Sequence, residues 1–214
     1  MELGKVLLIN KPLRWTSFDV VRKMQYKFKT KKVGHAGTLD PLATGLLILC
    51  TGTFTKRIEE FQAQEKEYTG TLVLGQTTPS YDLETEPTIA ISTSHITDEQ
   101  ITNATKKFIG NVRQKPPLHS AIRIKGRRAY DFARQGKNVE LGLRDVEIKE
   151  FFITEINKPF VRFKIVCSKG TYIRSIAHDF GQELGVGAYL SQLCRTRIGN
   201  FRLEEAVEVD QVEM

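Results

Sequence analysis

The stretch GHAGTLDPLATG, residues 34–45, holds three glycines, a proline, a histidine and a single carboxylate, Asp40. It is too broken for a strand, and its leucines and alanines make it too apolar for a solvated loop. A carboxylate with a reference pKa of about 3.9 is ionised at neutral pH and acts as a nucleophile when it is held at a site. Gly34 and Gly37 permit close approach of a bulky ligand to the backbone. The stretch is no P-loop, because no Gly-Lys-Ser/Thr sequence follows the glycines.

Asp40 also has a structural interpretation. Asp-Pro is a typical helix start, in which the aspartate caps the helix and Pro41 takes the first helical position without losing a donor. Spacing alone favours this capping role. The capping and nucleophile hypotheses do not exclude one another.

Basic residues are segregated from acidic ones in this chain of 214 residues and formal charge +7. Residues 22–32 carry six Lys/Arg and no acid, and residues 113–137 carry eight Lys/Arg against Asp131 alone. The acids gather in residues 82–99 and after Phe201. Any one basic run is typical of a solvated helix face, but two runs without acids favour a polyanionic partner. The apolar share of 40% excludes a disordered chain.

The cysteines and histidines form no recognisable metal or disulfide pattern. The three cysteines are widely spaced among apolar neighbours, which favours buried, reduced thiols in a cytoplasmic protein. No CxxC pair occurs and the four histidines lie at no ligand spacing, so we expect no metal site. The N-terminal apolar run is too short for a signal peptide or a membrane span.

Hydrophobic periodicity predicts an α+β protein. Hairpins outnumber βαβ units, so we expect a mixed, mainly antiparallel sheet flanked by helices. Thr16 with Asp19 and Thr97 with Gln100 are predicted capping boxes, and Thr55 and Thr171 are further predicted helix caps. The predicted strands are 5–10, 46–50, 68–74, 145–167 (a hairpin) and 188–197. The predicted helices start near 16, 55, 97, 130 and 171. We expect a long loop over 76–94, and we expect Gly110 to end the helix that starts near 97.

Four stretches in order resemble one known family. GHAGTLDPLATGLLIL (34–49) is similar to the catalytic motif of TruB-type tRNA pseudouridine synthases. The other three are KEYTGTLVLGQTT (66–78), QKPPLHSAIRIKGRRAYDFARQG (114–136) and CSKGTYIRSIAHDFGQELGVGAYLSQLCRT (167–196). The resemblance implies the pseudouridine synthase fold, with one catalytic domain over 1–214 and an RNA-gripping insertion over about 113–143. Longer members continue into a PUA-type RNA-binding domain, which we expect to be absent here.

The resemblance also implies roles for single residues. Asp40 matches the aspartate that attacks the target uridine, at C1′ of the sugar or C6 of the base, and Arg174 the arginine that pairs with this carboxylate. His35 matches a histidine that holds the extruded nucleotide. Tyr68 matches a tyrosine that stacks on the flipped uracil and aids late proton removal. The remaining implied contacts are Tyr172 and Leu193 to the nucleotide, and Arg123, Lys125, Arg127, Arg128, Arg195 and Arg197 to the RNA backbone.

Without the resemblance these residues have ordinary interpretations. A tyrosine in a strand, such as Tyr68, is more often a packing partner, and residues at a helix start, such as Tyr172, usually pack or meet solvent. Two departures from the family pattern are Cys194, which precedes Arg195 where a basic pair is usual, and the sequence LETEP after Asp82. The expected substrate is the T-arm stem-loop of tRNA, without a cofactor, guide RNA or obligate protein partner. The alternatives are a non-catalytic tRNA-binding or folding protein and a guide-RNA-dependent subunit.

Overall fold

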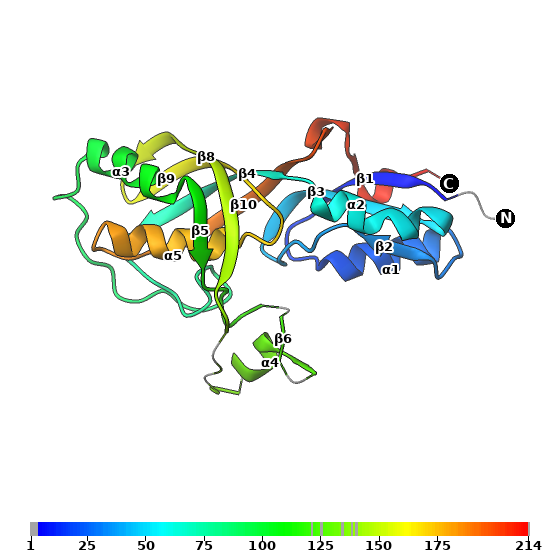
Figure 1. Cartoon of the computed structure of the whole chain (residues 1–214), viewed down its shortest axis with the longest axis horizontal. Helices are drawn as coiled ribbons and strands as arrows, with labels where there is room; N and C mark the ends of the chain where they lie inside the picture. Colours follow the sequence, from blue (N-terminus) through cyan, green and yellow to red (C-terminus); the bar gives the residue numbers. More distant parts are fainter. Residues whose placement is uncertain are drawn as a thin grey trace. The chain divides into compact units, whose positions relative to one another are not determined.

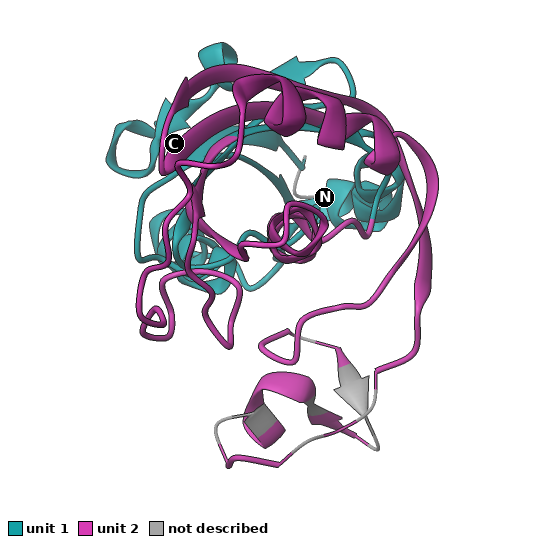
Figure 2. Ribbon diagram, turned by 90° about the vertical axis from the view of Figure 1, so that its left-hand side faces the viewer, with its two compact units in different colours: residues 1–69, 166–169, 192–214 teal, residues 70–165, 170–191 magenta. Residues whose placement is uncertain are grey.

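The computed structural model describes residues 4–120, 122–124, 126–133, 135–137, 139 and 141–213. The chain folds into two compact units, shown in separate colours in Figure 2. Unit 1 contains residues 1–69, 166–169 and 192–214, and unit 2 contains residues 70–165 and 170–191. Neither unit is a continuous segment, and the single catalytic domain expected over residues 1–214 stays a prediction.

The sheet of unit 1 is built around β3. β1 is antiparallel to β3, with Lys11 opposite Gly45, and β10 is parallel to β3, with Leu193 opposite Ala43. β2 is also antiparallel to β3, β12 is parallel to β1, and β11 is antiparallel to β10. The bounds are β1 Val6–Lys11, β2 Val33–His35, β3 Ala43–Thr51, β10 Ala188–Ile198, β11 Phe201–Arg202 and β12 Val207–Glu208, with the larger strands labelled in Figure 1.

α1 (Ser17–Lys27) begins where the sequence predicts it. The Asp19 amide donates to the Thr16 hydroxyl at 3.0 Å, and the Thr16 amide donates to the Asp19 carboxylate at 2.9 Å, which completes the capping box. The helix buries the face that carries Val20 and Met24 in a cluster with residues of β1 and β3. Local capping and amphipathic spacing thus place this helix correctly.

The helix expected from Thr55 takes a different form. A 3-10 helix, Gly52–Arg57, comes first and α2 (Ile58–Ala63) follows it. Thr55 lies inside the 3-10 helix, where its hydroxyl donates to the Gly52 carbonyl at 2.8 Å, so its predicted capping role is wrong. The chain leaves β3 through Gly52 (φ +53°), and helical turns therefore begin before Thr55. Two further 3-10 helices, Leu203–Glu205 and Val209–Gln211, lie near the C-terminus.

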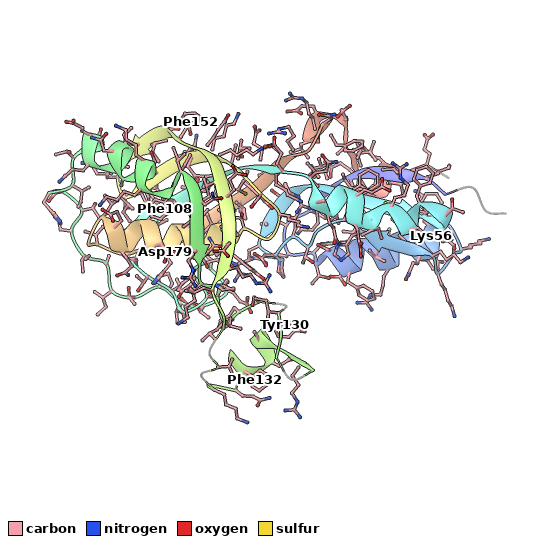
Figure 3. The ribbon with its side chains drawn as sticks, in the orientation of Figure 1. Lys56, Phe108, Tyr130, Phe132, Phe152 and Asp179 are labelled. Atoms are coloured by element: carbon pink, nitrogen blue, oxygen red, sulfur yellow. The ribbon has the colours of Figure 1, made fainter. Side chains whose placement is uncertain are left out.

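A second run of strands has the order β4-β9-β8-β5 and lies mostly in unit 2, but the first residues of β4, up to Thr69, and the last two of β9 belong to unit 1. β8 and β9 form the predicted hairpin, and β5 is antiparallel to β8. The rings of Phe108, Phe151, Phe163 and Phe180 pack into one core, in which the ring centres of Phe151 and Phe180 are 5.4 Å apart. Phe108 is labelled in Figure 3. The bounds are β4 Lys66–Leu74, β5 Gly110–Gln114, β8 Arg144–Asn157, β9 Phe160–Cys167, α3 Asp98–Ala104, a 3-10 helix Thr105–Phe108 and α5 Ile173–Glu183.

The predicted capping of the unit 2 helices is confirmed in two cases and wrong in one. Thr97 and Gln100 form the expected capping box of α3. The helical segment ends at Phe108 as predicted, and Gly110 follows its C-cap, Ile109, with φ +100° before β5 begins. α5 is preceded by Tyr172 without a side-chain cap, so the role predicted for Thr171 is wrong. Residues 76–94 hold no helix or strand, as predicted.

The expected insertion leaves the body of unit 2 between β5 and β8. Its described residues form a small hairpin and a short helix, which project from the rest of the unit in Figure 2. The bounds are β6 Arg123–Ile124, β7 Arg127–Arg128 and α4 Ala129–Ala133. The α+β class with a mixed, mostly antiparallel sheet is confirmed. None of the helices in the described part of the chain is long and apolar enough to cross a membrane.

Candidate active site

Asp40 lies in a short loop that joins β2 to β3 in unit 1. His35 at the end of β2 is opposite Leu49, and the Ala36 amide donates to the Ile48 carbonyl at 2.9 Å. The chain then leaves the sheet and returns to it at Ala43, where β3 begins. Asp40 is therefore presented by a hairpin connection whose two arms are fixed by backbone hydrogen bonds.

The predicted capping role of Asp40 is wrong. The Ala43 amide donates to the Asp40 carbonyl at 3.0 Å, which closes a turn, and no helix follows. Pro41 occupies the second position of this turn, where its fixed φ is also favoured. Pairing of β3 with β1 and β10 decides the outcome, because a helix here would remove the start of β3 from the sheet.

The loop is anchored on both sides of Asp40. The Leu39 amide donates to the Ser17 hydroxyl at 2.9 Å, and the Arg14 amide donates to the Pro41 carbonyl at 2.7 Å. Leu39 itself is buried. The residues before and after Asp40 thus have fixed partners near the start of α1, as a preorganised nucleophile requires.

Arg195 is buried beneath this loop, with 1% of its surface exposed. Its guanidinium donates to the carbonyls of Leu46 at 2.8 Å and Gly37 at 3.1 Å, with Thr38 further away at 3.5 Å. The prediction that Arg195 contacts RNA phosphate is wrong, because the side chain is enclosed and its donors are directed at the protein backbone. Its role is to support the loop that carries Asp40.

β10 approaches β3 closely at the position of Arg195. A Cβ atom built on Gly45 would lie 2.4 Å from the Arg195 carbonyl oxygen, and Gly45 has φ +100°. Only glycine fits this position without displacing β10. The last glycine of the 34–45 stretch is therefore needed for packing under the site.

Tyr68, from β4, lies within the electrostatic influence of the same arginine. Its side chain is 8% exposed. Burial raises the pKa of Tyr68, and the nearby Asp40 charge raises it further, against the opposing effect of Arg195. The phenol therefore keeps its proton at neutral pH, next to the predicted nucleophile.

Lys11 is a second buried cation beside Asp40, and the sequence reasoning missed it. The side chain is fully buried, and Nζ donates to the carbonyls of Trp15 at 2.6 Å and Pro12 at 2.9 Å. Burial lowers the pKa of Lys11 to about 8, although the Asp40 charge opposes this shift. The sequence signal for this buried lysine was its position at the end of an apolar strand, in VLLINKP, where a solvated side chain is not expected.

His35 and Leu193 lie on the elements that flank the loop. Burial, followed by the charge of Arg195, lowers the pKa of His35, so its imidazole is neutral at pH 7. Its Nδ1 atom is buried without a hydrogen-bond partner among the described residues. Leu193 is partly exposed and lies opposite Ala43, three positions after Asp40. Both residues lie in unit 1 with Asp40, Tyr68 and Arg195.

Tyr172 and Arg174 belong to unit 2, where both are held by other residues. The Tyr172 amide donates to the Gln114 side chain at 2.7 Å, and that side chain donates back to the Tyr172 carbonyl at 2.9 Å. Arg174 is 3% exposed, lies 3.6 Å from the Asp82 carboxylate, and donates to the His119 carbonyl at 2.9 Å. The expected ion pair between Arg174 and Asp40 would join the two units, and it stays a prediction.

The other predicted RNA contacts have different environments. Arg127 is exposed on β7, while Arg123 and Arg128 are opposite one another in the β6–β7 hairpin. Lys125 lies outside the described residues. Arg197 pairs with two carboxylates, Glu65 at 2.8 Å and Glu67 at 3.8 Å, in unit 1. The phosphate contact of Arg197 stays a prediction, and these ion pairs within the protein compete with it.

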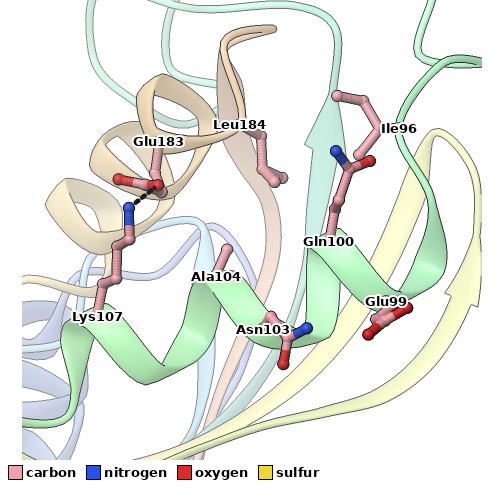
Figure 4. A pocket seen from close by; sticks show the side chains of 8 residues that line it. All are labelled: Ile96, Glu99, Gln100, Asn103, Ala104, Lys107, Glu183 and Leu184. Atoms are coloured by element: carbon pink, nitrogen blue, oxygen red, sulfur yellow. Dashed lines mark hydrogen bonds and ion pairs between the residues drawn. The ribbon is translucent and has the colours of Figure 1, made fainter.

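A separate pocket of about 410 Å³ lies in unit 2 between α3 and α5 (Figure 4). Lys107 and Glu183 form an ion pair at its edge. None of the predicted site residues lines it. Within the described part of the chain, no group of three His, Cys, Asp or Glu side chains is arranged to hold a metal ion.

Comparison with known families gives a match over most of the chain. Residues 25–173 match the family model described as TruB family pseudouridylate synthase (N terminal domain). Residues 174–214 match the model described as tRNA pseudouridylate synthase B C-terminal domain. The compact units divide the chain differently, because residues 192–214 fold with residues 1–69 in unit 1.

Curated relatives match at high identity over nearly their full length. A protein of Flavobacterium johnsoniae named tRNA pseudouridine synthase B is 51% identical over 98% of this chain and 95% of its own length. A protein of Phocaeicola vulgatus with the same name is 52% identical over 97% of this chain and 91% of its own length.

Solved structures match the fold. A chain in the crystal structure of a Cbf5-Nop10-Gar1 complex superposes on 96% of this chain with a TM-score of 0.74 and 30% identity. A chain in the structure of an H/ACA RNP bound to a substrate RNA containing 2'-deoxyuridine superposes on 96% with a TM-score of 0.72 and 26% identity. This chain spans about half the length of those two chains, 53% and 51%.

Proposed function

Because the chain belongs to the TruB family of pseudouridylate synthases, we propose that it isomerises the T-loop uridine of tRNA to pseudouridine, with Asp40 as the nucleophile. It is a tRNA pseudouridine synthase, as its relatives of about half identical sequence are named. The observation that carries the proposal for Asp40 is the loop anchored at Leu39 and Pro41 and supported by the buried Arg195, which donates to the Gly37 carbonyl.

The proposed reaction is a rearrangement without net loss or gain of atoms. The Asp40 carboxylate bonds to C1′ of the ribose or to C6 of the uracil, and the bond between C1′ and N1 breaks. The uracil turns, C5 bonds to C1′, and the bond to Asp40 breaks, which returns the free carboxylate. C5 then loses its proton and N1 gains one, so that the product is an isomer of the uridine. Nothing is oxidised and no group is transferred to a second molecule, so the proposal needs no cofactor.

The residues around Asp40 suit a base that has left its stack. Extrusion of a nucleotide costs roughly a few kcal/mol, and aromatic or apolar contacts offset it. Tyr68 supplies a ring and a protonated hydroxyl, which suits proton transfer near C5 late in the reaction. The partly exposed Leu193 supplies an apolar contact beside the loop.

The proposed substrate is the T-arm stem-loop itself, in the cytoplasm. The three free cysteines suit a reducing compartment, and burial raises the pKa of Cys50 to about 11, which keeps this thiol protonated and unreactive. Binding to a bare T-arm requires no guide RNA and no second protein.

The decisive experiment uses a bare T-arm transcript labelled with tritium at C5 of uridine. Formation of pseudouridine releases the label into water, and mapping of the product locates the modified position. Release by the purified chain alone supports the proposal. A chain that binds the transcript but releases no tritium is instead the non-catalytic tRNA-binding protein, and release only after addition of a guide RNA indicates the guide-dependent class.

A further inference from the structure

The solvent-exposed side of α1 carries a stripe in which cationic and aromatic side chains alternate. Phe18, Arg22 and Tyr26 are spaced by four residues, so they lie on one face of the helix. Phe18 is 57% exposed and Tyr26 is 87% exposed. The Arg22 guanidinium lies 5.3 Å from the centre of the Phe18 ring. We refer to Phe18, Arg22, Lys23 and Tyr26 as the α1 face.

The fold of unit 1 does not require these aromatic rings. α1 buries its opposite side through Val20, Val21 and Met24, in the cluster that includes β1 and β3. An exposed helix position is served at least as well by alanine or a charged residue. Two large rings in water, separated by an arginine, therefore point to a ligand rather than to packing.

The charge of this region is positive, and its acidic partners are weakly held. Residues 22–32 contain six Lys/Arg and no acid. Arg22 pairs with Asp19 at 3.1 Å and Lys23 pairs with Asp210 at 3.1 Å, but both pairs are open to solvent. Exposed pairs of this kind add little to stability, so a phosphate group can replace the carboxylate.

A hollow of about 520 Å³ lies at the start of this face. It is lined by Arg14, Trp15, Asp19, Arg22 and Lys23, so three of its five lining side chains are cationic. The Trp15 ring adds an aromatic surface beside them. The hollow thus offers the same two features as the helix stripe, positive charge and aromatic surface.

From these observations we propose that the α1 face binds a single-stranded segment of RNA outside the site around Asp40. Unpaired bases stack on Phe18 and Tyr26, and the intervening phosphates contact Arg22 and Lys23. Phe18 and Tyr26 lie eight residues apart, about 12 Å along the helix axis, so the face contacts more than one nucleotide. The six basic residues without an acid in 22–32 favour a polyanion as the ligand, and the exposed rings suit the unpaired bases of RNA. The inference rests on the proposed function, because that function makes RNA the substrate.

The test measures binding of a short fluorescent oligouridine and of an RNA duplex of equal length to the full chain. One variant is Phe18→Ala with Tyr26→Ala, and a second is Arg22→Ala with Lys23→Ala. The control is Phe152→Ala with Arg162→Ala on β8 and β9, where Phe152 is labelled in Figure 3. Phe152 is 54% exposed, and the Arg162 side chain is 64% exposed and paired with Glu155 at 2.9 Å, which matches Phe18 and Arg22 closely.

Loss of the two rings is expected to weaken oligouridine binding roughly tenfold or more while duplex binding stays within twofold. Loss of the two cations is expected to weaken both, and to flatten the slope of log affinity against log salt by about 0.7 per lost single-strand contact. The control stays within twofold of wild type. Phe18→Leu with Tyr26→Leu keeps apolar bulk without a ring, and it shows the same loss for oligouridine if stacking is responsible.

Oligouridine binding by the ring-loss variant within twofold of wild type overturns the inference. So does an equal loss in the control, or a change in sedimentation that assigns the face to contact between copies of the chain. The proposed function is judged separately, by tritium release from the T-arm by the wild-type chain. If wild type releases none, that function fails, while the binding comparison still decides the role of the α1 face.

Discussion

The guanidinium of Arg195 donates to the carbonyl of Gly37 at 3.1 Å, three residues before Asp40. The charge of Arg195 also lowers the pKa of Tyr68, against the larger opposing effect of burial. The loop of the predicted nucleophile is therefore supported by a cation from β10 that also acts on the predicted stacking residue. This cation has only 1% of its surface exposed.

Asp40→Asn is expected to abolish turnover while the fold and RNA affinity remain. The amide cannot form the covalent bond, but the turn between Asp40 and Ala43 uses only backbone atoms. We expect tritium release to fall at least a thousandfold, with the melting temperature and the affinity for the T-arm near wild type. Asp210→Asn, at an exposed aspartate, is the control. Residual activity within tenfold of wild type would remove Asp40 from the nucleophile's role.

Tyr68→Phe is expected to lower kcat about a hundredfold with little change in KM. The ring that stacks on the base remains, whereas the buried hydroxyl and its contribution to proton transfer are lost. Steady-state kinetics on the T-arm measure both constants. Tyr189→Phe is the control, because burial raises the pKa of that phenol too. A rise in KM with unchanged kcat would show that the hydroxyl only positions RNA.

Arg195→Lys is expected to impair catalysis through position rather than charge. Lysine keeps the charge but cannot present the planar set of donors that reaches the carbonyls of Leu46 and Gly37 together. Each lost charge-assisted hydrogen bond costs about 1.5–3 kcal/mol, so the melting temperature should fall by several degrees. We expect kcat to fall tenfold to a hundredfold and KM to change little. Arg162→Lys serves as the control, and lower stability with normal kcat would make Arg195 a structural residue only.

The sequence predicts local features of this fold better than distant contacts. The two capping boxes, at Thr16 and Thr97, are correct because each is formed by residues three positions apart. The helix expected at Asp40 is wrong because sheet pairing with β1 and β10 overrides the local Asp-Pro signal. At Asp40, the pairing of strands in the sheet outweighs the local propensity for a helix.

The supporting role of Arg195 also depends on a contact between residues far apart in the sequence, which the sequence does not predict. Its acceptor on Gly37 is 158 residues away, so no spacing rule links them, and the resemblance implied a phosphate contact instead. The resemblance identified Asp40, His35, Tyr68 and Leu193, which the structure places in unit 1, but it did not identify Arg195 and Lys11 as the buried cations beneath and beside the loop. Such supports become visible only once the strands are paired.

The buried Lys11 is expected to make the free energy of unfolding depend on pH in the alkaline range. Its pKa in the folded chain is about 8, below the ordinary 10.5, so the unfolded chain binds more protons between these values. The free energy of unfolding therefore rises as pH increases from about 8 towards 10.5. Relative to Lys11→Met, wild type should gain on the order of 1–3 kcal/mol over this window, as measured by urea unfolding. Lys23→Met, at an exposed lysine, should show no such difference. Equal pH dependence in wild type and Lys11→Met would contradict the assigned burial of the ammonium.

The corrected map of RNA contacts makes opposite predictions for two arginines. Arg127 is exposed on β7, whereas Arg197 is paired with Glu65 and Glu67. Arg127→Ala should raise KM for the T-arm more than it lowers kcat, and should flatten the salt dependence of binding by about 0.7–0.9, one phosphate contact. Arg197→Gln should lower the melting temperature but leave that slope unchanged, because its charge meets carboxylates rather than phosphates.

The measurement is KM against salt for the isolated T-arm and for full tRNA, which should be nearly equal substrates. A flatter slope for Arg197→Gln would restore that residue to the RNA surface, and a hundredfold preference for full tRNA would show that the chain also grips RNA beyond the T-arm.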